Sequence, residues 1–124
     1  MDRILLDFDG VFNLYEGWVP GEIPPPRPGI KEFLEALKDQ GYSLVVFTAR
    51  TPLEDVENWL LKNDLMLYIE DVTNIKIPAK LYIDDNAITF KGDYDTVLEQ
   101  VSNFKPYWEV SSGLRGIAKR IWAK

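Results

Sequence analysis

The stretch that most constrains the fold is residues 4–11, Ile-Leu-Leu-Asp-Phe-Asp-Gly-Val. Three consecutive apolar residues are too few for a helix and predict a buried strand of a parallel sheet, which runs directly into Asp7 and Asp9. Residues two apart in a strand point the same way, so both carboxylates can share one face before the chain bends at Gly10. Neighbouring anions repel unless a cation or a shared proton joins them. The spacing therefore favours a divalent metal site, with an acidic turn after a core strand as the alternative.

The composition removes much of the enzymatic repertoire, because the 124 residues include neither cysteine nor histidine. Thiol nucleophiles, histidine bases, Ser-His-Asp triads and Cys/His zinc sites are therefore excluded. Catalysis by this chain has to use carboxylates, lysine, arginine, hydroxyl groups and a metal that prefers oxygen ligands.

The length and the charge predict one globular domain with an acidic surface. Hydrophobic residues make up 46% and charged residues 27%, and the net charge is −6. That charge argues against a broad surface for nucleic acid or anionic membranes. The N-terminal residues have no basic start followed by a long apolar run, so we expect neither a signal peptide nor a membrane span, and a cytoplasmic location is the default.

Predicted helices and strands alternate along the rest of the chain. A proline-rich flap loop over residues 11–29 is expected to be ordered, because Phe12, Tyr15 and Trp18 can anchor it. The expected helices are residues 30–40, a second one that Thr51 caps with Pro52 at its first position, and a third one capped by Asp93 or Asp95. The expected strands are residues 43–47, a short segment ending near residue 73, residues 81–83 and a candidate at 88–90. Alternation with short connections predicts a parallel sheet with right-handed crossovers.

Three of these strands end in polar clusters. Asp7 and Asp9 follow the first, the tripeptide 48–50 (Thr-Ala-Arg) follows the second, and Asp84 and Asp85 follow the strand at 81–83. Because parallel strands end at the same edge of a sheet, the three clusters are expected to converge on one crevice. Together they supply carboxylates, a hydroxyl group and a cation, which are the groups that phosphoryl transfer needs.

In chain order, the three clusters and Lys76 resemble the four motifs of the haloacid dehalogenase-like (HAD) phosphohydrolase superfamily. Residues 7–11 are similar to the first motif, Thr48 to the second, Lys76 to the third, and the pair Asp84-Asp85 to the fourth. The resemblance covers roughly residues 1–90. It implies a Rossmann-like, three-layer α/β/α fold around a mainly parallel sheet. Because the segments between the motifs are short, it also implies that there is no cap domain.

The resemblance also implies a role for each residue. Asp7 would be the nucleophile that forms an aspartyl phosphate, and Asp9 would protonate the leaving oxygen and then activate water. Thr48 and Lys76 would contact the phosphoryl group, with Lys80 as an alternative lysine, and Ala49 and Arg50 would border the substrate. The implied cofactor is Mg²⁺, held by Asp7, by the Asp9 backbone carbonyl and by Asp84 or Asp85. Val11 departs from the family pattern, since many members carry threonine there.

The implied activity is that of a Mg²⁺-dependent phosphomonoester hydrolase acting on a phosphorylated substrate of unknown class. The alternatives are a phosphatase that processes nucleic-acid ends and a non-catalytic binding module that keeps the fold. A site without a cap stays open unless a neighbouring subunit closes it, so a homo-oligomer is a further alternative.

The last part of the chain differs in charge from the core region, residues 1–103. Residues 104–124 carry five basic residues and one acidic residue. Their spacing predicts a basic amphipathic helix, which Ser111 or Ser112 would cap. Packing on the acidic body of the domain is the favoured interpretation, with a dimer contact or an anionic partner as the alternatives.

Overall fold

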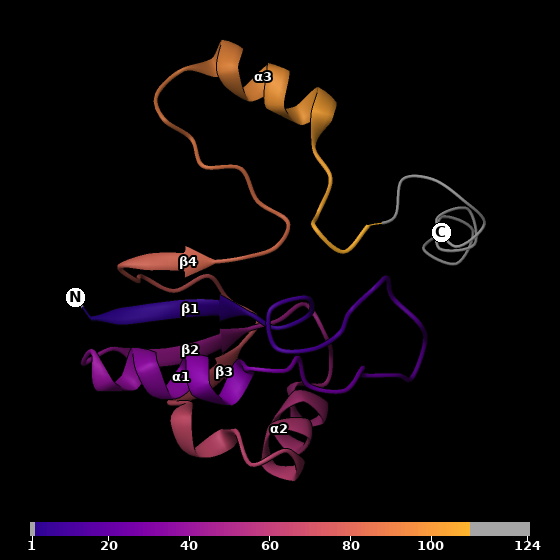
Figure 1. Ribbon diagram of the computed structural model, residues 1–124, viewed down its shortest axis with the longest axis vertical. Helices are drawn as coiled ribbons and strands as arrows, with labels where there is room; N and C mark the ends of the chain where they lie inside the picture. The colour runs from indigo at the N-terminus through magenta and orange to yellow at the C-terminus, as the bar shows by residue number, and fades with distance from the viewer. Residues whose placement is uncertain (1, 110–124) are drawn as a thin grey trace.

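A computed structural model of the chain describes residues 2–109, in which helices and strands alternate (Figure 1). The strands are β1 (Arg3–Asp7), β2 (Ser43–Phe47), β3 (Asp71–Thr73) and β4 (Leu81–Ile83). The helices are α1 (Ile30–Asp39), α2 (Leu53–Lys62) and α3 (Tyr94–Asn103), with a single turn of 3₁₀ helix, η1, over Met66–Tyr68. The predicted helix in the basic tail falls at residues 110–124 and lies outside the described residues.

The four strands form one sheet in the order β3-β2-β1-β4, and each neighbouring pair is parallel. The prediction of a parallel sheet is thus confirmed. The chain moves outward from β1 through β2 to β3 and then returns to the opposite side of β1 to form β4. Strand order therefore reverses between β1 and β4, and in open α/β sheets such a reversal opens a crevice at the carboxyl ends of the strands.

One face of the sheet carries the hydrophobic core. Alternate residues of the strands point to this face and pack against buried residues of α1 and α2, as expected for a period of two along a strand. The buried cluster comprises Ile4, Leu6, Phe8, Phe12, Ile30, Leu34, Leu44, Val46, Val56, Trp59, Leu60, Leu65 and Val72. Both helices thus cover the same face, and they fix the strand ends that carry the polar clusters.

The opposite face is covered differently. Leu5 and Val45, which face away from the helices, are each only 1% exposed. On this side the connection from β3 returns to β4, and the Tyr82 hydroxyl donates a hydrogen bond to the carbonyl of Ile77 at 3.0 Å. Helix α3 has no buried residue and lies beyond β4, away from the strands (Figure 1). The described part of the chain is therefore a mixed α/β fold with an all-parallel sheet, and the three-layer arrangement stays a prediction.

Three local predictions can be compared with the structure. Asp93 caps α3 as predicted, because its side chain accepts a hydrogen bond from the Asp95 backbone N–H. The predicted cap at Thr51 is wrong, since α2 begins at Leu53 and Pro52 has the extended backbone of an N-cap residue. The candidate strand at 88–90 does not form, and Phe90 instead stacks on Tyr94, with ring centroids 5.2 Å apart.

The proline-rich loop is tied to the body of the domain. Phe12 is fully buried, and the backbone of Asn13 forms an antiparallel bridge with Pro26. The carbonyl of Pro24 accepts a hydrogen bond from Trp59 Nε1 at 3.1 Å. Trp18 is 52% exposed and is not the anchor that the sequence predicted. The loop is nonetheless ordered, because apolar burial and backbone hydrogen bonds compensate for its irregular conformation.

None of the helices over residues 2–109 combines the length and the apolar character that crossing a membrane requires.

Candidate metal centre

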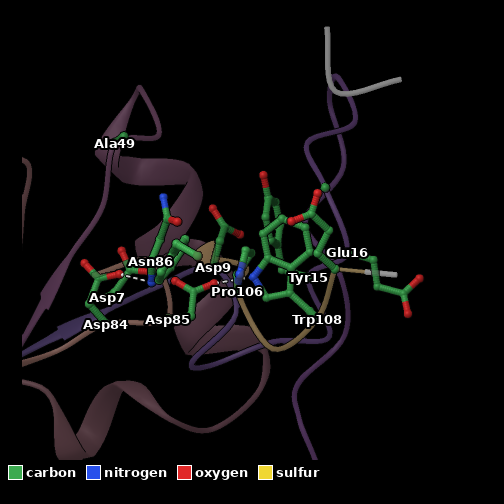
Figure 2. Close-up of a pocket in the computed structure, with 13 residues that line it drawn as sticks. Asp7, Asp9, Tyr15, Glu16, Ala49, Asp84, Asp85, Asn86, Pro106 and Trp108 are labelled. Carbon is green, nitrogen blue, oxygen red and sulfur yellow. Dashed lines mark hydrogen bonds between the residues drawn. The ribbon is translucent and has the colours of Figure 1, made fainter. Parts of the chain in front are cut away.

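Two neighbouring strands place three carboxylates at one point. Asp7 is the last residue of β1, and Asp84 and Asp85 directly follow β4, whose Ile83 is paired with Leu6. One carboxylate oxygen from each of the three aspartates lies within 4.8 Å of the others. The convergence of the first and last polar clusters is thus observed, and Figure 2 shows these side chains gathered at one end of a cavity.

Within this triad (Asp7, Asp84 and Asp85), burial and the neighbouring carboxylates raise the pKa of Asp7 and of Asp84. Burial is the largest cause at Asp7, followed by a hydrogen bond that its protonated form makes with Asp85 and by the charges of the other acids, and together they raise the pKa of Asp7 to about 9. Burial and the Asp85 carboxylate also raise the pKa of Asp84, although a hydrogen bond from the Asn86 backbone N–H opposes the shift. Without a cation, the triad therefore keeps a proton at neutral pH.

Asp85 is held against the chain at Gly10. A Cβ at Gly10 would lie 2.1 Å from Asp85 Oδ2, and the glycine has a φ of +86°, which favours residues without a Cβ. The indole N–H of Trp108 donates a hydrogen bond to the same oxygen. The glycine of the first motif thus makes room for an acid that lies 75 residues further along the chain.

Asp9 has a different environment from the triad. Its two oxygens accept hydrogen bonds from Arg50 Nε at 2.8 Å and from Arg50 Nη2 at 3.0 Å, which makes a bidentate ion pair. Asn13, whose side chain is fully buried, donates to Asp9 Oδ1 at 3.0 Å and accepts from the Gly10 backbone N–H. Sequence reasoning did not find Asn13. A polar residue four positions after Asp9 and beside a buried Phe12 was the available signal.

The remaining predicted residues lie near the acids with different degrees of contact. Thr48 is buried, and its hydroxyl oxygen accepts from the Arg50 backbone N–H at 3.0 Å, while Ala49 lines the cavity of the triad. Lys76 borders a neighbouring cavity together with Asp7 and Asp84, but its ammonium group lies over the Tyr82 ring, 4.6 Å from the centroid. No ion pair joins Lys76 to an acid within residues 2–109.

The alternative lysine, Lys80, lies at the opposite edge of the sheet. Its backbone N–H donates to the carbonyl of Arg3 at the start of β1, and its ammonium group contacts Tyr42 before β2. Because the amino ends of the strands face away from the triad, Lys76 is the better placed of the two lysines.

The cavity beside the triad has a volume of about 630 Å³ and is strongly acidic. Its lining residues are Asp7, Asp9, Tyr15, Glu16, Gly17, Ala49, Asp84, Asp85, Asn86, Phe104, Pro106, Trp108 and Glu109. Among the described residues, no lysine or arginine lines it. Sequence reasoning missed the contribution of residues 104–109, for which the adjacent aromatic residues Tyr107 and Trp108 were the available signal.

The donor set of the triad fits a hard divalent cation. All its ligand atoms are carboxylate oxygens, which Mg²⁺ and Ca²⁺ prefer. The three side chains that would hold the ion are Asp7, Asp84 and Asp85. Oxygen ligands alone do not select Mg²⁺ over other hard cations.

Comparisons with known proteins support the fold. No family model matches this chain, and no curated protein matches it. A solved structure, described as that of a conserved protein coded by locus from Bacteroides thetaiotaomicron, is similar to it with a TM-score of 0.57 at 20% sequence identity. The match covers 90% of this chain and 98% of the other. At this identity the likeness concerns the fold alone, which is a mixed α/β fold with a parallel sheet, consistent with a Rossmann-like arrangement.

Proposed function

We propose that this chain is a Mg²⁺-dependent phosphomonoester hydrolase that works through an aspartyl phosphate on Asp7, with an HAD-like core and no cap domain. One observation carries the proposal, namely that Asp7, Asp84 and Asp85 bring their oxygens within 4.8 Å of one another at the switch point of the sheet. Asp9 lines the same cavity. A nucleophile, a cation site and a second carboxylate are thus available at one place, as phosphoryl transfer requires.

In the proposed reaction Asp7 attacks phosphorus, and the bond from phosphorus to the ester oxygen breaks. Asp9 gives its proton to the leaving oxygen and then takes a proton from the water that hydrolyses the aspartyl phosphate, which releases phosphate and free Asp7. A bound Mg²⁺ would neutralise the acids and the phosphoryl oxygens. Thr48 and Lys76 would contact the phosphoryl group, the latter after its ammonium leaves the Tyr82 ring.

The contacts of Asp9 bear on its proposed role. Both of its oxygens accept hydrogen bonds from Arg50, at 2.8 Å from Nε and at 3.0 Å from Nη2. To act as an acid, Asp9 has to take up a proton and part from the guanidinium. Arg50 also donates to the carbonyl of Glu22 at 3.0 Å, so the same arginine connects Asp9 to the proline-rich loop.

The acidic lining of the cavity bears on the substrate. A nucleic-acid end brings several phosphates, and a cavity that no described basic residue lines would repel the additional ones. A small phosphomonoester is therefore favoured over a polyanion.

The test is hydrolysis of an aryl phosphate by the full chain in Mg²⁺, repeated in EDTA and with Asp7→Asn. We expect EDTA to abolish turnover and Asp7→Asn to lower kcat by about 10⁴-fold or more, because the nucleophile is lost. Glu35→Gln, on an exposed glutamate of α1, is a control for a change of charge away from the site and should retain most of the activity. Turnover that survives both EDTA and Asp7→Asn would contradict the proposal, and Mg²⁺ binding without turnover on a broad panel of phosphate esters would favour a binding module.

A further inference from the structure

Residues from the segment 104–109 line the triad cavity, although this segment follows the last helix of the described chain. The Tyr107 hydroxyl donates a hydrogen bond to the carbonyl of Gly10. Arg27, from the proline-rich loop, donates from Nη1 to the Tyr107 oxygen at 2.6 Å, and its guanidinium carbon lies 4.9 Å from the centroid of that ring. The segment is thus attached both to the first motif and to the loop that precedes α1.

Trp108, one residue further, reaches the acids themselves. Its indole N–H donates to Asp85 Oδ2, while its ring packs edge-to-face on Tyr15 with centroids 5.0 Å apart and an interplanar angle of 84°. Figure 2 shows Tyr15 and Trp108 together beside Asp85, with Asp7 and Asp84 beyond it. An indole N–H is only a donor, so it engages one carboxylate oxygen and leaves the other for a cation.

Two restraints therefore act on the same oxygen of Asp85. From one side the backbone at Gly10 is close enough that no Cβ would fit, and from the other side Trp108 supplies a hydrogen bond. The Asp85 carboxyl is also hydrogen-bonded to Asp7. Asp84 is more exposed, and it accepts a local hydrogen bond from the Asn86 backbone N–H. Of the two acids after β4, Asp85 is the one that distant parts of the chain orient.

We propose that Trp108 is a positioning residue of the cation site, which holds Asp85 in the orientation that faces Asp7, so that residues 104–109 form part of the metal centre. The inference rests on the cation site of the proposed function. Partners that hydrogen-bond to metal ligands orient those ligands, and their loss typically weakens metal binding by about 10- to 100-fold.

The experiment measures Mg²⁺ affinity of the full chain by titration calorimetry, with Trp108→Phe as the main variant. Phenylalanine keeps an aromatic ring for Tyr15 but removes the N–H, so we expect the Mg²⁺ Kd to rise by about 10- to 100-fold. Tyr94→Phe, on the 77% exposed tyrosine of α3, is the matched control and should leave the Kd unchanged. A thermal melt in EDTA checks that Trp108→Phe folds like the wild type.

A double-mutant cycle separates positioning from a general structural role. If Trp108 acts through Asp85, adding Trp108→Phe to Asp85→Asn should weaken Mg²⁺ binding by no more than about threefold beyond Asp85→Asn alone. If Trp108→Phe instead causes a general loss of structure, it should weaken Mg²⁺ binding by the same factor in the wild type and in Asp85→Asn. Tyr107→Phe provides a second test if Trp108→Phe fails to fold, because it loosens the same segment at Gly10 and should also raise the Kd.

The outcomes distinguish this inference from the function on which it rests. If Trp108→Phe and Tyr107→Phe bind Mg²⁺ as tightly as the wild type, the role of Trp108 is overturned, but the proposed cation site is not. Wild-type chain that binds no Mg²⁺ would overturn both proposals together.

Discussion

The two parts of the acidic site, Asp9 and the triad, differ in whether a positive charge of the chain lies beside them. Asp9 has its counter-charge within the chain, because Arg50 pairs with both of its oxygens and Asn13 adds a further hydrogen bond. The triad formed by Asp7, Asp84 and Asp85 has no described basic residue beside it in its cavity, and the pKa of Asp7 rises to about 9. Asp9 thus has a positively charged partner within the folded chain, whereas we propose that the other three carboxylates bind an ion from solution.

This difference suits Asp7 and Asp9 to separate roles, although they are neighbours in the sequence. Asp7 and Asp9 are two residues apart in the same motif. Asp7 ends β1 and lies close to the two acids that follow β4, whereas Asp9 pairs with Arg50, which follows β2. Pairs of carboxylates whose surroundings differ in this way are typical of sites that need two functions from one residue type. The following predictions test the contrast, beginning with the largest effect.

The largest effect expected is on the pH dependence of cation binding. A cation binds the ionised triad, so below a pKa of about 9 it has to displace the proton of Asp7, and the apparent Mg²⁺ affinity should fall about tenfold per pH unit. Between pH 8 and pH 6 calorimetry should therefore show a loss of about 100-fold. Asp7→Asn, which has no such proton, should bind more weakly but with little dependence on pH. If the Mg²⁺ affinity of the wild type does not change over this pH range, the triad does not bind the cation in competition with a proton on Asp7.

The built-in ion pair should contribute to the stability of the fold. Arg50→Ala leaves Asp9 without its partner, with the two side chains only 13% and 22% exposed, and we expect the free energy of unfolding in urea to fall by about 2 kcal/mol. Arg3→Ala is the matched control, because Arg3 pairs with Glu70 at 3.6 Å in a more exposed position and should cost about 1 kcal/mol or less. Equal losses in the two variants would argue against a special role for the pair of Asp9 and Arg50.

The smallest effect expected is on the stability of the cation-free protein. The folded-state pKa of Asp7 is raised from 3.8 to about 9, so the folded state binds more protons than the unfolded state between these values. Stability should therefore fall as the pH rises through this window. In EDTA at pH 8, Asp7→Asn should melt a few degrees above the wild type, and the difference should shrink toward pH 4. Saturating Mg²⁺ should reverse the order, because it binds the folded wild type more tightly. A variant that melts below the wild type in EDTA would contradict this account.

Much of the framework could be predicted from the sequence, because it depends on local patterns. Short apolar runs such as residues 4–6 and 81–83 predicted parallel strands, and the positions where they end placed Asp7 and Asp84 at a common edge. Helical spacing predicted α1, and Asp93, one of two candidate caps with Asp95, marks the start of α3. Each of these features is set by residues close together in the chain, where periodicity and capping act.

Contacts between distant residues were decided by the tertiary structure alone. No local pattern indicates that Arg50 pairs with Asp9, that a missing Cβ at Gly10 admits Asp85, or that Trp108 reaches the same acid from beyond the last described helix. The sequence by itself determined which carboxylates gather at the end of the sheet, because strand direction brings them there. Only the folded chain decided which of them pairs with a described basic residue, because that choice depends on side chains that packing brings together.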